Sequence, residues 1–492
     1  MDDQAATLAF LADPASYGQP SLAVERIDTH LSAVFLAGEF AYKLKRALTL
    51  PFVDFSTLEQ RHAACAAELA VNRRTAAALY LDIRAVRRVG DRLTFDGDGE
   101  IVDWVVVMRR FPDDALWDAR AAAGSIAADD VRDLADAIAA FHAAAETTPA
   151  HGSVADLDWT RAGNAVDLVR FFDGTACAAL DVKTAAQIAA HAQLIAARAA
   201  DFHVRRCHGD LHLRNITTLG GKPVPFDAIE FDDRISCIDT LYDVAFLLVD
   251  WLRVGRSDFA SQTLSRYLQR RPDEAGLALL PLFLSLRAAV KAKTRAMAGA
   301  MDEAQSCFDM AARFLSPPPA RLIAVGGLSG TGKSALAAAL APSIGAAPGA
   351  LVLRSDVERK RLAGLAPEMK LPPSAYTKEA SAAVYASLHK RAQAALGAGH
   401  SVIVDAVYAD AAERAAVAAL APPGRFIGLW LDCPEPIRLA RVGARAGDAS
   451  DADEAVVRFQ SGLGADAGDW ETIDAGGPPE RTLAAALLRQ VK

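Results

Sequence analysis

The feature that most constrains how this chain folds is the glycine-rich octapeptide GLSGTGKS at Gly327–Ser334. It matches the pattern G-x-x-x-x-G-K-S at every fixed position, follows the apolar segment 321–326 and precedes an alanine-rich segment that begins at Ala335. In this context the motif predicts a strand, then a loop that surrounds phosphate with backbone N–H groups, then a helix whose N-terminus carries partial positive charge. The chain is therefore expected to contain a nucleotide-binding domain.

Residues of this motif are candidate nucleotide ligands, and they are Gly327, Gly330, Gly332, Lys333 and Ser334. Glycine has no side chain that would obstruct the approach of backbone N–H groups to phosphate oxygens. The ammonium group of Lys333 is expected to reach the outer phosphates, and the hydroxyl of Ser334 is expected to bind Mg²⁺. ATP and Mg²⁺ are thus the predicted cofactors.

Strands and helices alternate through the part of the chain that contains this motif. The expected strands are short apolar segments at 322–325, 351–353, 401–405, 426–431 and 472–473. Alternation of this kind predicts a parallel sheet covered by helices on both faces, which is an α/β fold.

Two aspartates follow predicted strands at the edge of the sheet where ligands bind in such folds. Asp356 comes directly after the second strand, and a carboxylate there can accept the proton of an attacking hydroxyl group. Asp405 ends the segment VIVD and is suited to direct or indirect binding of magnesium. Taken singly, either aspartate would also be explained by a helix cap or a surface salt bridge.

Three arginines further along the chain are spaced three and four residues apart. Arg438, Arg441 and Arg445 would share one face of a predicted helix, and such a face can neutralise the charge of a phosphoryl group during transfer. Arg441 and Arg445 are therefore candidate catalytic residues. A solvated helix face is the alternative interpretation.

On these motifs, residues 321–492 resemble small P-loop kinases of the gluconate-kinase, chloramphenicol-phosphotransferase and zeta-toxin type. The segment 441–460 is similar to the lid of a group of predicted small kinases. The resemblance implies ATP-dependent phosphorylation of a hydroxyl group on a small compound.

The clearest domain boundary is the run of three prolines at 317–319. Consecutive prolines cannot continue a helix and form a stiff, extended spacer. We therefore expect one domain over residues 1–316 and the P-loop domain over residues 320–492.

The first domain is expected to have a small strand-rich lobe over about 1–107 and a helical lobe over about 108–316. A hairpin is predicted at 33–45, and the capping-box pattern Ser56–Glu59 should start a helix that runs toward Arg74. Further strands are expected at 83–89, 92–95 and 101–108.

A second motif, HGDLHLRN, occupies residues 208–215 of this first domain. An aspartate followed five residues later by an asparagine, here Asp210 and Asn215, is the spacing of a kinase catalytic loop. In such a loop the aspartate orients or deprotonates the acceptor hydroxyl and the asparagine binds magnesium. Asp227, twelve residues beyond Asn215, is placed where a second magnesium-binding carboxylate is needed.

The H-G-D-x-H-x-x-N pattern resembles that of the aminoglycoside phosphotransferase family, which also includes choline, homoserine and methylthioribose kinases. The resemblance covers about residues 27–252 and implies a bilobal, protein-kinase-like α+β fold. It also implies that Asp210 is the catalytic base and that Asn215 and Asp227 are metal ligands.

By the same resemblance, the phosphate-binding lysine is Lys43 or Lys45. Strand alternation places both side chains on one face, and Lys43 is the preferred candidate. Glu68, on the helix that follows, is the candidate ion-pair partner. An exposed strand edge would also explain the lysines, and a solvated helix position would also explain Glu68.

The first domain departs from the family pattern in two places. No G-x-G-x-x-G loop is found between its first strands, and the segment 29–32 (THLS) occupies that turn. Asp227 is followed by AIEFDD, in which Glu230 or Asp232 would add to the metal site or cap a turn. Asp239 and Asp243, near the start of an apolar helix, are expected to brace the catalytic loop.

A zinc site is a rival interpretation of the same region. His203, Cys207, His208 and His212 have spacings compatible with zinc ligands. The catalytic-loop interpretation already accounts for His208 and His212, whereas a zinc site would leave Asp210 and Asn215 without a role.

Composition sets limits on partners and location. The 492 residues carry a formal net charge of -8, which does not favour binding to nucleic acid. The acidic N-terminus does not resemble a signal peptide, and no uninterrupted apolar run reaches membrane-spanning length. Six scattered cysteines without a CxxC pair fit a reducing cytoplasm.

The sequence therefore predicts a cytoplasmic, bifunctional, ATP-dependent kinase with one active site per domain and a small hydroxyl compound, sugar-like or aminocyclitol-like, as acceptor. One alternative is that one domain is catalytic and the other is a regulatory ATP-binding module. Another is a polynucleotide 5′-hydroxyl kinase in the second domain.

Overall fold

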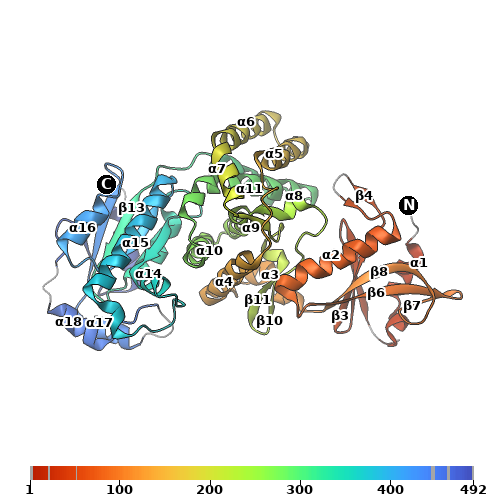
Figure 1. Ribbon diagram of the computed structural model, residues 1–492, viewed down its shortest axis with the longest axis horizontal. Helices are drawn as coiled ribbons and strands as arrows, with labels where there is room; N and C mark the ends of the chain where they lie inside the picture. The colour runs from red at the N-terminus through yellow and green to blue at the C-terminus, as the bar shows by residue number, and fades with distance from the viewer. Residues whose placement is uncertain are drawn as a thin grey trace. The chain divides into compact units, whose positions relative to one another are not determined.

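The computed structural model describes residues 4–19, 21, 23–50, 53–444, 449–462 and 466–489. It divides into two compact units, each of which is built from two stretches of the chain. The first unit consists of Met1–Trp159 and Ala192–Leu247, and the second consists of Thr160–His191 and Leu248–Lys492. Figure 1 labels many of the elements of both units.

A six-stranded antiparallel sheet forms the N-terminal part of the first unit, with strand order β1-β2-β3-β8-β6-β7. Its strands are β1 (Val24–Asp28), β2 (Ser32–Ala37), β3 (Phe40–Lys45), β6 (Tyr80–Val89), β7 (Arg92–Thr94) and β8 (Glu100–Arg109). The predicted hairpin is β2 and β3, which pair from Ser32 with Lys45 to Ala37 with Phe40.

The sheet buries both of its faces, as alternation along β8 shows. Val105 and Val107 belong to a core cluster that includes Leu11 of helix α1 (Ala5–Ala12). Val106 belongs to the opposite cluster, which includes Cys65 of helix α2 (Leu58–Ala76). Because successive side chains of a strand point to opposite faces, one strand supplies both cores.

Helix α2 begins one residue later than the sequence led us to expect. The capping box is formed by Thr57 and Gln60, whose side chains each bind the other residue's backbone N–H, and not by Ser56 and Glu59. The Ser56 backbone N–H instead donates to the carboxylate of Asp54.

The remainder of the first unit is mainly helical and contains the catalytic-loop motif between strands β9 and β10. Its helices are α3 (Trp117–Ala122), α4 (Ala128–Ala144), α7 (Ala192–Ala200) and α8 (Asp233–Ser236). Its shorter strands are β4 (Thr49–Leu50), β5 (Val53–Asp54), β9 (Val204–Arg206), β10 (Ile216–Leu219), β11 (Lys222–Pro225) and β12 (Cys237–Asp239). Helices α5 (Val154–Leu168) and α9 (Thr240–Arg253) each contribute residues to both units.

The second unit has a helical part followed by a parallel sheet. Its helical elements are α6 (Gly174–Ala190), α10 (Ser257–Arg270), the 3₁₀ helix η4 (Glu274–Leu279), α11 (Leu280–Met297) and α12 (Met301–Phe314). The unit continues through the three prolines without a break. The compact units therefore divide the chain at other places than the proline boundary.

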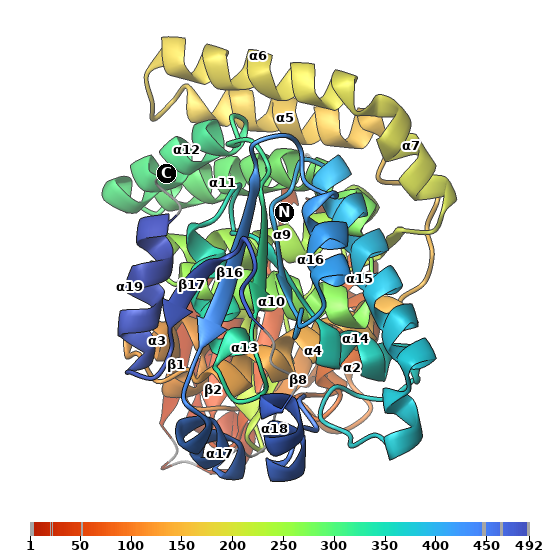
Figure 2. The same cartoon turned by 90° about the vertical axis from the view of Figure 1, so that its left-hand side faces the viewer.

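Five parallel strands form the sheet of the second unit, in the order β14-β15-β13-β16-β17. They are β13 (Leu322–Gly326), β14 (Leu351–Arg354), β15 (Val402–Asp405), β16 (Phe426–Asp432) and β17 (Glu471–Asp474), which are the five strands expected from the sequence. The helices are α13 (Lys333–Leu340), α14 (Ser355–Leu362), α15 (Lys378–Gly397), α16 (Ala411–Ala418), α17 (Glu435–Gly443), α18 (Glu454–Ser461) and α19 (Pro479–Arg489). Figure 2 shows α19 on one side of β16 and β17 and α15 and α16 on the other, so the predicted α/β fold is confirmed.

One helical segment, Glu274–Met297, is long and apolar enough by composition to cross a membrane. Within the second unit, 78% of its apolar window is buried, which is the pattern of a core helix.

Candidate active sites

The catalytic-loop motif of the first unit brings its predicted acid and amide into contact. The Asn215 side chain, at the end of the 3₁₀ helix η3 (Leu213–Asn215), donates from Nδ2 to Asp210 Oδ2 at 2.9 Å and to the Asp210 backbone carbonyl at 3.0 Å. His212 Nε2 lies 3.3 Å from the same carboxylate oxygen. The loop therefore holds Asp210 in a defined orientation with its amide partner beside it.

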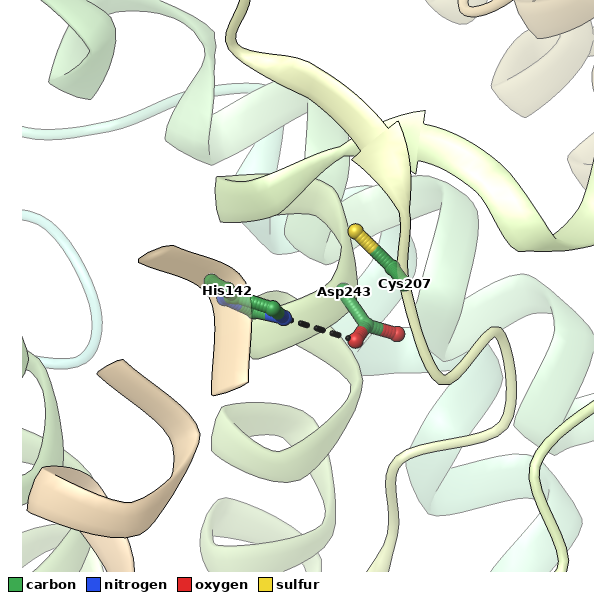
Figure 3. Close-up of side chains that lie close together, drawn as sticks. All are labelled: His142, Cys207 and Asp243. Carbon is green, nitrogen blue, oxygen red and sulfur yellow. Dashed lines mark hydrogen bonds and ion pairs between the residues drawn. The ribbon is translucent and has the colours of Figure 1, made fainter. Parts of the chain in front are cut away.

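Asp243 braces this loop through hydrogen bonds to its backbone, as the sequence predicted. Its carboxylate is fully buried and accepts the backbone N–H of His208 at 3.0 Å and that of Gly209 at 2.9 Å. His142 Nε2 lies 3.0 Å from Asp243 Oδ2, and Figure 3 shows its ring directed at the carboxylate, with Cys207 nearby. Asp239 binds Arg198 at 2.6 Å instead of the loop.

His142, Cys207 and Asp243 are close enough together to be considered as metal ligands, since their ligand atoms lie within 4.8 Å of one another. Both Asp243 oxygens, however, already accept hydrogen bonds from the loop. Burial raises the pKa of the Cys207 thiol well above its ordinary value, and a protonated thiol is a poor ligand. The cluster is best explained as a brace.

The rival zinc site proposed from sequence is not formed. Among the described residues, His203, Cys207, His208 and His212 do not come together as a group of three or more ligands. His208 instead lies with Nε2 2.9 Å from the Phe226 carbonyl, and burial lowers its pKa.

A buried cluster of lysines and carboxylates joins β3 and α2 to the segment that follows β11. Each oxygen of Glu68 binds one lysine: Oε1 lies 2.7 Å from Lys43 Nζ, and Oε2 lies 2.5 Å from Lys45 Nζ. Lys43 also lies 2.6 Å from Asp227 Oδ1, and Lys45 lies 2.5 Å from Glu230 Oε1. Glu68 is thus neither solvated nor bound to a single lysine.

Charge pairing sets the ionisation of this cluster. Burial alone would lower the pKa of Lys43, but the carboxylates of Asp227 and Glu68 outweigh it and raise that pKa well above its usual value. Burial would likewise raise the pKa of Glu68, yet the two lysines lower it to about 2. For Glu230 burial prevails and the pKa is raised.

Asp227 has an unusual backbone conformation, with φ of +61°. A residue other than glycine rarely adopts this conformation without cost, and such strain is concentrated at functional sites. The backbone is held by a hydrogen bond from the Asp227 N–H to the Tyr80 hydroxyl at 3.2 Å and one from the Ala228 N–H to Asn72 Oδ1 at 2.7 Å. These contacts direct the Asp227 carboxylate to Lys43.

The two departures from the family pattern have local explanations. In the turn at 29–32, the Thr29 hydroxyl and the Ser32 backbone bind each other at 3.0 Å, which closes a tight turn between β1 and β2. Asp232 caps helix α8 by accepting the Arg234 backbone N–H. Glu230 binds Lys45 in the lysine cluster.

In the second unit, the P-loop joins β13 to α13 as the motif requires. Gly327 and Gly330 are at positive φ, and a β-carbon at Gly330 would lie 2.7 Å from the backbone oxygen of Arg438 in α17. A β-carbon at Gly327 would lie 2.7 Å from the carbonyl oxygen of Leu431. These close approaches explain why the loop requires glycine at both positions.

Residues of the loop contact one another and the lid. Lys333 Nζ donates to the Leu328 carbonyl at 3.2 Å, and the Ser329 backbone N–H donates to Gln460 Oε1 of α18 at 2.7 Å. Gln460 was within the lid segment noted in the sequence, but no pattern singled it out, because its partner lies 131 residues away.

The structure describes two of the three arginines, Arg438 and Arg441, which lie three residues apart on α17 and have different surroundings. Arg438 is buried and donates to the Cys433 carbonyl at 3.1 Å and to the Ser461 hydroxyl at 2.6 Å. Its backbone packs closely against Gly330 of the P-loop. Arg441 donates to the Thr331 carbonyl at 3.3 Å, beside the P-loop. Helix α17 ends at Gly443, and Arg445 lies outside the described residues.

The two predicted aspartates of this unit lie at the carboxyl edge of the sheet. The Ser334 hydroxyl donates to Asp405 Oδ2 at 2.5 Å, and Arg354 Nε lies 3.4 Å from the same oxygen. Asp356 is in the first turn of α14, and its pKa is raised by burial and then by the charge of Asp405. A carboxylate with a raised pKa is a better proton acceptor.

These groups line one cavity of about 570 Å³. Besides Lys333, Ser334, Asp356 and Asp405, its lining includes residues that the sequence did not single out, namely Arg359, Tyr376, Tyr385, Asp410, Glu413 and Asp451. Arg359 has a signal that could have revealed it, since it lies three residues after Asp356 and so on the same face of a helix. Asp410 and Glu413 both lie at the start of α16, and the other three come from separate parts of the chain.

Both sites have the donors that ATP and magnesium need. Oxygen ligands suit Mg²⁺, and Ser334 with Asp405 in one site and Asn215 with Asp227 in the other supply a hydroxyl, an amide and carboxylates. In the second unit, the positive-φ glycines and the start of α13 supply backbone N–H groups for phosphate.

Comparison with known proteins finds two family matches in this chain. Residues 52–280 match the Phosphotransferase enzyme family, and residues 322–462 match the AAA domain family. The two matches lie on either side of the three prolines.

The chain is also similar to full-length relatives. It is 30% identical over 481 residues to uncharacterized proteins of Mycobacterium tuberculosis and Mycobacterium bovis, with 93% of this chain and 94% of each relative covered. Among solved structures, a sugar kinase from a Janibacter species is 25% identical, with a TM-score of 0.28, and covers 35% of this chain and 94% of its own. A thermostable mutant of an aminoglycoside phosphotransferase is 17% identical, with a TM-score of 0.39, and covers 62% of this chain and 97% of its own. The chain therefore belongs to the same family as the mycobacterial proteins, and it is an ATP-dependent kinase that joins a Phosphotransferase enzyme family domain to a P-loop AAA domain.

Proposed function

We propose that the protein is a bifunctional kinase with one active site in each domain, and that both sites transfer phosphate from ATP to hydroxyl groups of small molecules. The domains are residues 1–316 and 320–492, joined by the prolines. The observation that carries the proposal is that each domain places a lysine and several oxygen-bearing side chains together. In each domain these groups would serve as a lysine for phosphate, oxygen ligands for a metal, and a separate aspartate for the acceptor. A regulatory ATP-binding module would not need the acceptor aspartate.

In the first site, Asp210 accepts the proton of the acceptor hydroxyl, and Asn215 Nδ2 holds its carboxylate in place. Asn215 and Asp227 are the candidate metal ligands. Lys43 is the candidate phosphate ligand, because it reaches Asp227, whereas Lys45 lies deeper between Glu68 and Glu230. Lys45 thereby fixes the position of Glu68, which in turn aims Lys43.

In the second site, Lys333 and the P-loop N–H groups bind the phosphates, and Asp356 accepts the proton of the acceptor. Ser334 and Asp405 are the candidate metal ligands, and Arg441 is a candidate for neutralising phosphate charge. Arg445 remains a candidate on its spacing alone. Magnesium, when bound at either site, neutralises the negative charge of the phosphate oxygens.

Charges in the second cavity favour a neutral or cationic acceptor, such as a polyol or an aminocyclitol. Five carboxylates line this cavity but only two cations, Lys333 and Arg359; the carboxylates are Asp356, Asp405, Asp410, Glu413 and Asp451. A polyanion would be repelled by these carboxylates. This arrangement argues against a polynucleotide as the acceptor.

A location in the cytoplasm is part of the proposal. All six cysteines are free and buried. Free cysteines are typical of proteins from reducing compartments.

The test is to count nucleotides and then to silence each site separately. Titration of the full chain with a non-hydrolysable ATP analogue and magnesium should show two equivalents bound. Lys333→Ala should remove one of them, and Lys43→Met should weaken the other. Phosphate transfer from γ-labelled ATP to a pool of small polyols and aminocyclitols should then divide into Asp210-dependent and Asp356-dependent products. A single equivalent, abolished by Lys333→Ala alone, would refute the two-site proposal.

A further inference from the structure

One edge of the parallel sheet, strand β14, is covered by a helix from the part of the chain that matches the Phosphotransferase enzyme family. β14 is the edge strand, and helix α10 packs against it within the second unit. The Val352 backbone N–H, which has no strand partner on that side, donates to the Ser265 hydroxyl of α10 at 3.2 Å. Ser265 lies within the residues that match the Phosphotransferase enzyme family, whereas β14 lies within the residues that match the AAA domain family. A helix from the first match therefore covers the edge of the sheet in the second.

A buried arginine joins the two families beside this edge. Arg391, on α15, binds Glu274 of η4 through Nε at 2.7 Å and donates to the Leu268 carbonyl at the end of α10 at 3.0 Å. It also binds Glu358 of α14 at 2.8 Å. Arg391, Glu274 and Glu358 are all buried, so this is a desolvated network and not a surface salt bridge.

Helix α14 connects this network to the cavity, because it contributes residues to both. Asp356 and Arg359 line the cavity, while Glu358 and Arg361 lie in the network. Arg361 Nε donates to Glu358 Oε2 at 3.0 Å, and the Ser387 hydroxyl of α15 also binds Glu358. In this helix of eight residues, Asp356 therefore lies only two residues from Glu358, whose buried carboxylate binds Arg391.

The geometry of Arg391 makes Glu274 important for the position of α14. The planar guanidinium group presents its donors in a rigid fork, so its contacts with Glu274 and Leu268 on one side fix where Glu358 can bind on the other. Loss of Glu274 would leave a buried positive charge with one carboxylate instead of two, and the arginine would have to move or attract water.

We propose that α10 and η4 of the phosphotransferase domain are a positioning element of the P-loop active site, in which Glu274 holds α14 through Arg391 and Glu358 so that Asp356 faces the cavity. This inference rests on the proposed kinase activity of that site. Glu274, Arg391 and Glu358 are positioning residues, and none of them is among the residues that line the cavity.

The experiment uses the full chain with Asp210→Asn to silence the first site, and it measures Lys333-dependent release of phosphate from ATP. Glu274→Gln should lower kcat roughly 10- to 100-fold, the order of loss expected when a reacting group is displaced by about 1 Å. The KM for ATP and the affinity for a fluorescent ATP analogue should change less than about twofold, because the phosphate-binding loop connects β13 to α13 and Glu274 reaches α14 through Arg391. Glu274→Asp keeps the charge and should retain more activity.

The matched control is Glu368→Gln. Glu368 pairs at 3.1 Å with Arg266 of α10, so it bridges the same two families, but its side chain is 42% exposed and it does not belong to the Arg391 network. Its substitution should change kcat less than about twofold, as expected for an exposed ion pair.

Different outcomes would contradict the positioning role of Glu274 and the kinase activity of the P-loop site. A folded Glu274→Gln protein with unchanged kcat would overturn the inference alone, and so would a loss in Glu368→Gln as large as that in Glu274→Gln. If Glu274→Gln does not fold, the kcat of Glu274→Asp decides, and an undiminished value overturns the inference. Absence of any Lys333-dependent turnover before these changes would overturn both the second active site and its positioning element.

Discussion

The two candidate sites hold their phosphate-binding lysines in opposite ways. Lys43 is fixed by carboxylates from distant parts of the chain, among them Asp227, 184 residues away. Lys333 lies in a contiguous loop, and its contact with the Leu328 carbonyl is five residues away. The position of Lys43 therefore depends on tertiary packing, whereas that of Lys333 depends mostly on local backbone conformation. This difference predicts that replacing the buried partner of Lys43 lowers both stability and activity, whereas replacing Lys333 lowers activity with little effect on stability.

The largest expected effect tests whether the sites are independent at all. Asp210→Asn should lower phosphate transfer at the first site by roughly 10²- to 10⁴-fold, because the acceptor loses its base. Lys333-dependent turnover should stay unchanged. Initial rates with γ-labelled ATP, measured with each site's own acceptor, provide the check, and a parallel loss of both activities would contradict independence.

Glu68→Gln tests the coupling of stability and activity. The substitution leaves two buried lysines with less compensating charge, and breaking a buried pair in this way costs about 3–5 kcal/mol in the free energy of unfolding. First-site activity should fall with it. Lys333→Ala is the comparison, since it should abolish second-site turnover with little change in unfolding by urea. Equal destabilisation by Glu68→Gln and Lys333→Ala would contradict a difference between the two sites in how stability and activity are coupled.

The same cluster predicts an acid limit to stability. The pKa of Glu68 is lowered from 4.5 to about 2 on folding, so its contribution is complete above pH 4.5 and is lost as the pH falls toward 2. The unfolding free energy of the wild type should therefore drop more steeply over this window than that of Glu68→Gln. Urea titrations at a series of pH values would show it, and parallel slopes would count against the cluster's charge state.

At the second site, pH should act on turnover. The pKa of Asp356 is raised above its ordinary 3.8, so this carboxyl becomes protonated at a higher pH than a solvated aspartate. Because the base must be ionised, kcat should fall about tenfold per pH unit below that pKa. Asp356→Asn should be slow and should lack this acid limb. An acid limb that persists in Asp356→Asn would assign it to another group.

The smallest effect is expected at Arg441. Arg441→Lys keeps the charge but cannot span the carbonyls of Thr331 and Gly477, which the guanidinium group binds at 3.3 and 3.1 Å. Loss of one such hydrogen bond should lower second-site kcat about fivefold. An effect as large as that of Lys333→Ala would mean that Arg441 binds the transferring phosphate more directly than proposed.

The sequence predicted those features that a short stretch of chain determines. The P-loop, the five strands of the parallel sheet and the loop that carries Asp210 and Asn215 depend on residues close together in sequence, and the structure contains them. The Lys43–Glu68 ion pair was also expected, because a known fold implied it.

What the sequence missed depends on pairs that only packing brings together. Lys45 with Glu230 and Arg391 with Glu274 are separated by 185 and 117 residues, and neither belongs to a motif. Periodicity placed Arg438 and Arg441 on one helix face, but it could not show that the P-loop packs against Arg438 and buries it. Spacing defines a face of a helix and does not reveal what covers it.

The Ser265 hydroxyl that caps the edge of β14 has a consequence for how this protein can be divided. A shortened chain that starts after Pro319 would retain every P-loop residue, yet it would present the bare backbone of β14 to solvent. Unsatisfied strand edges recruit other strands, so the isolated domain should self-associate and precipitate. We therefore expect the C-terminal domain to depend for its solubility on the preceding domain of the same polypeptide.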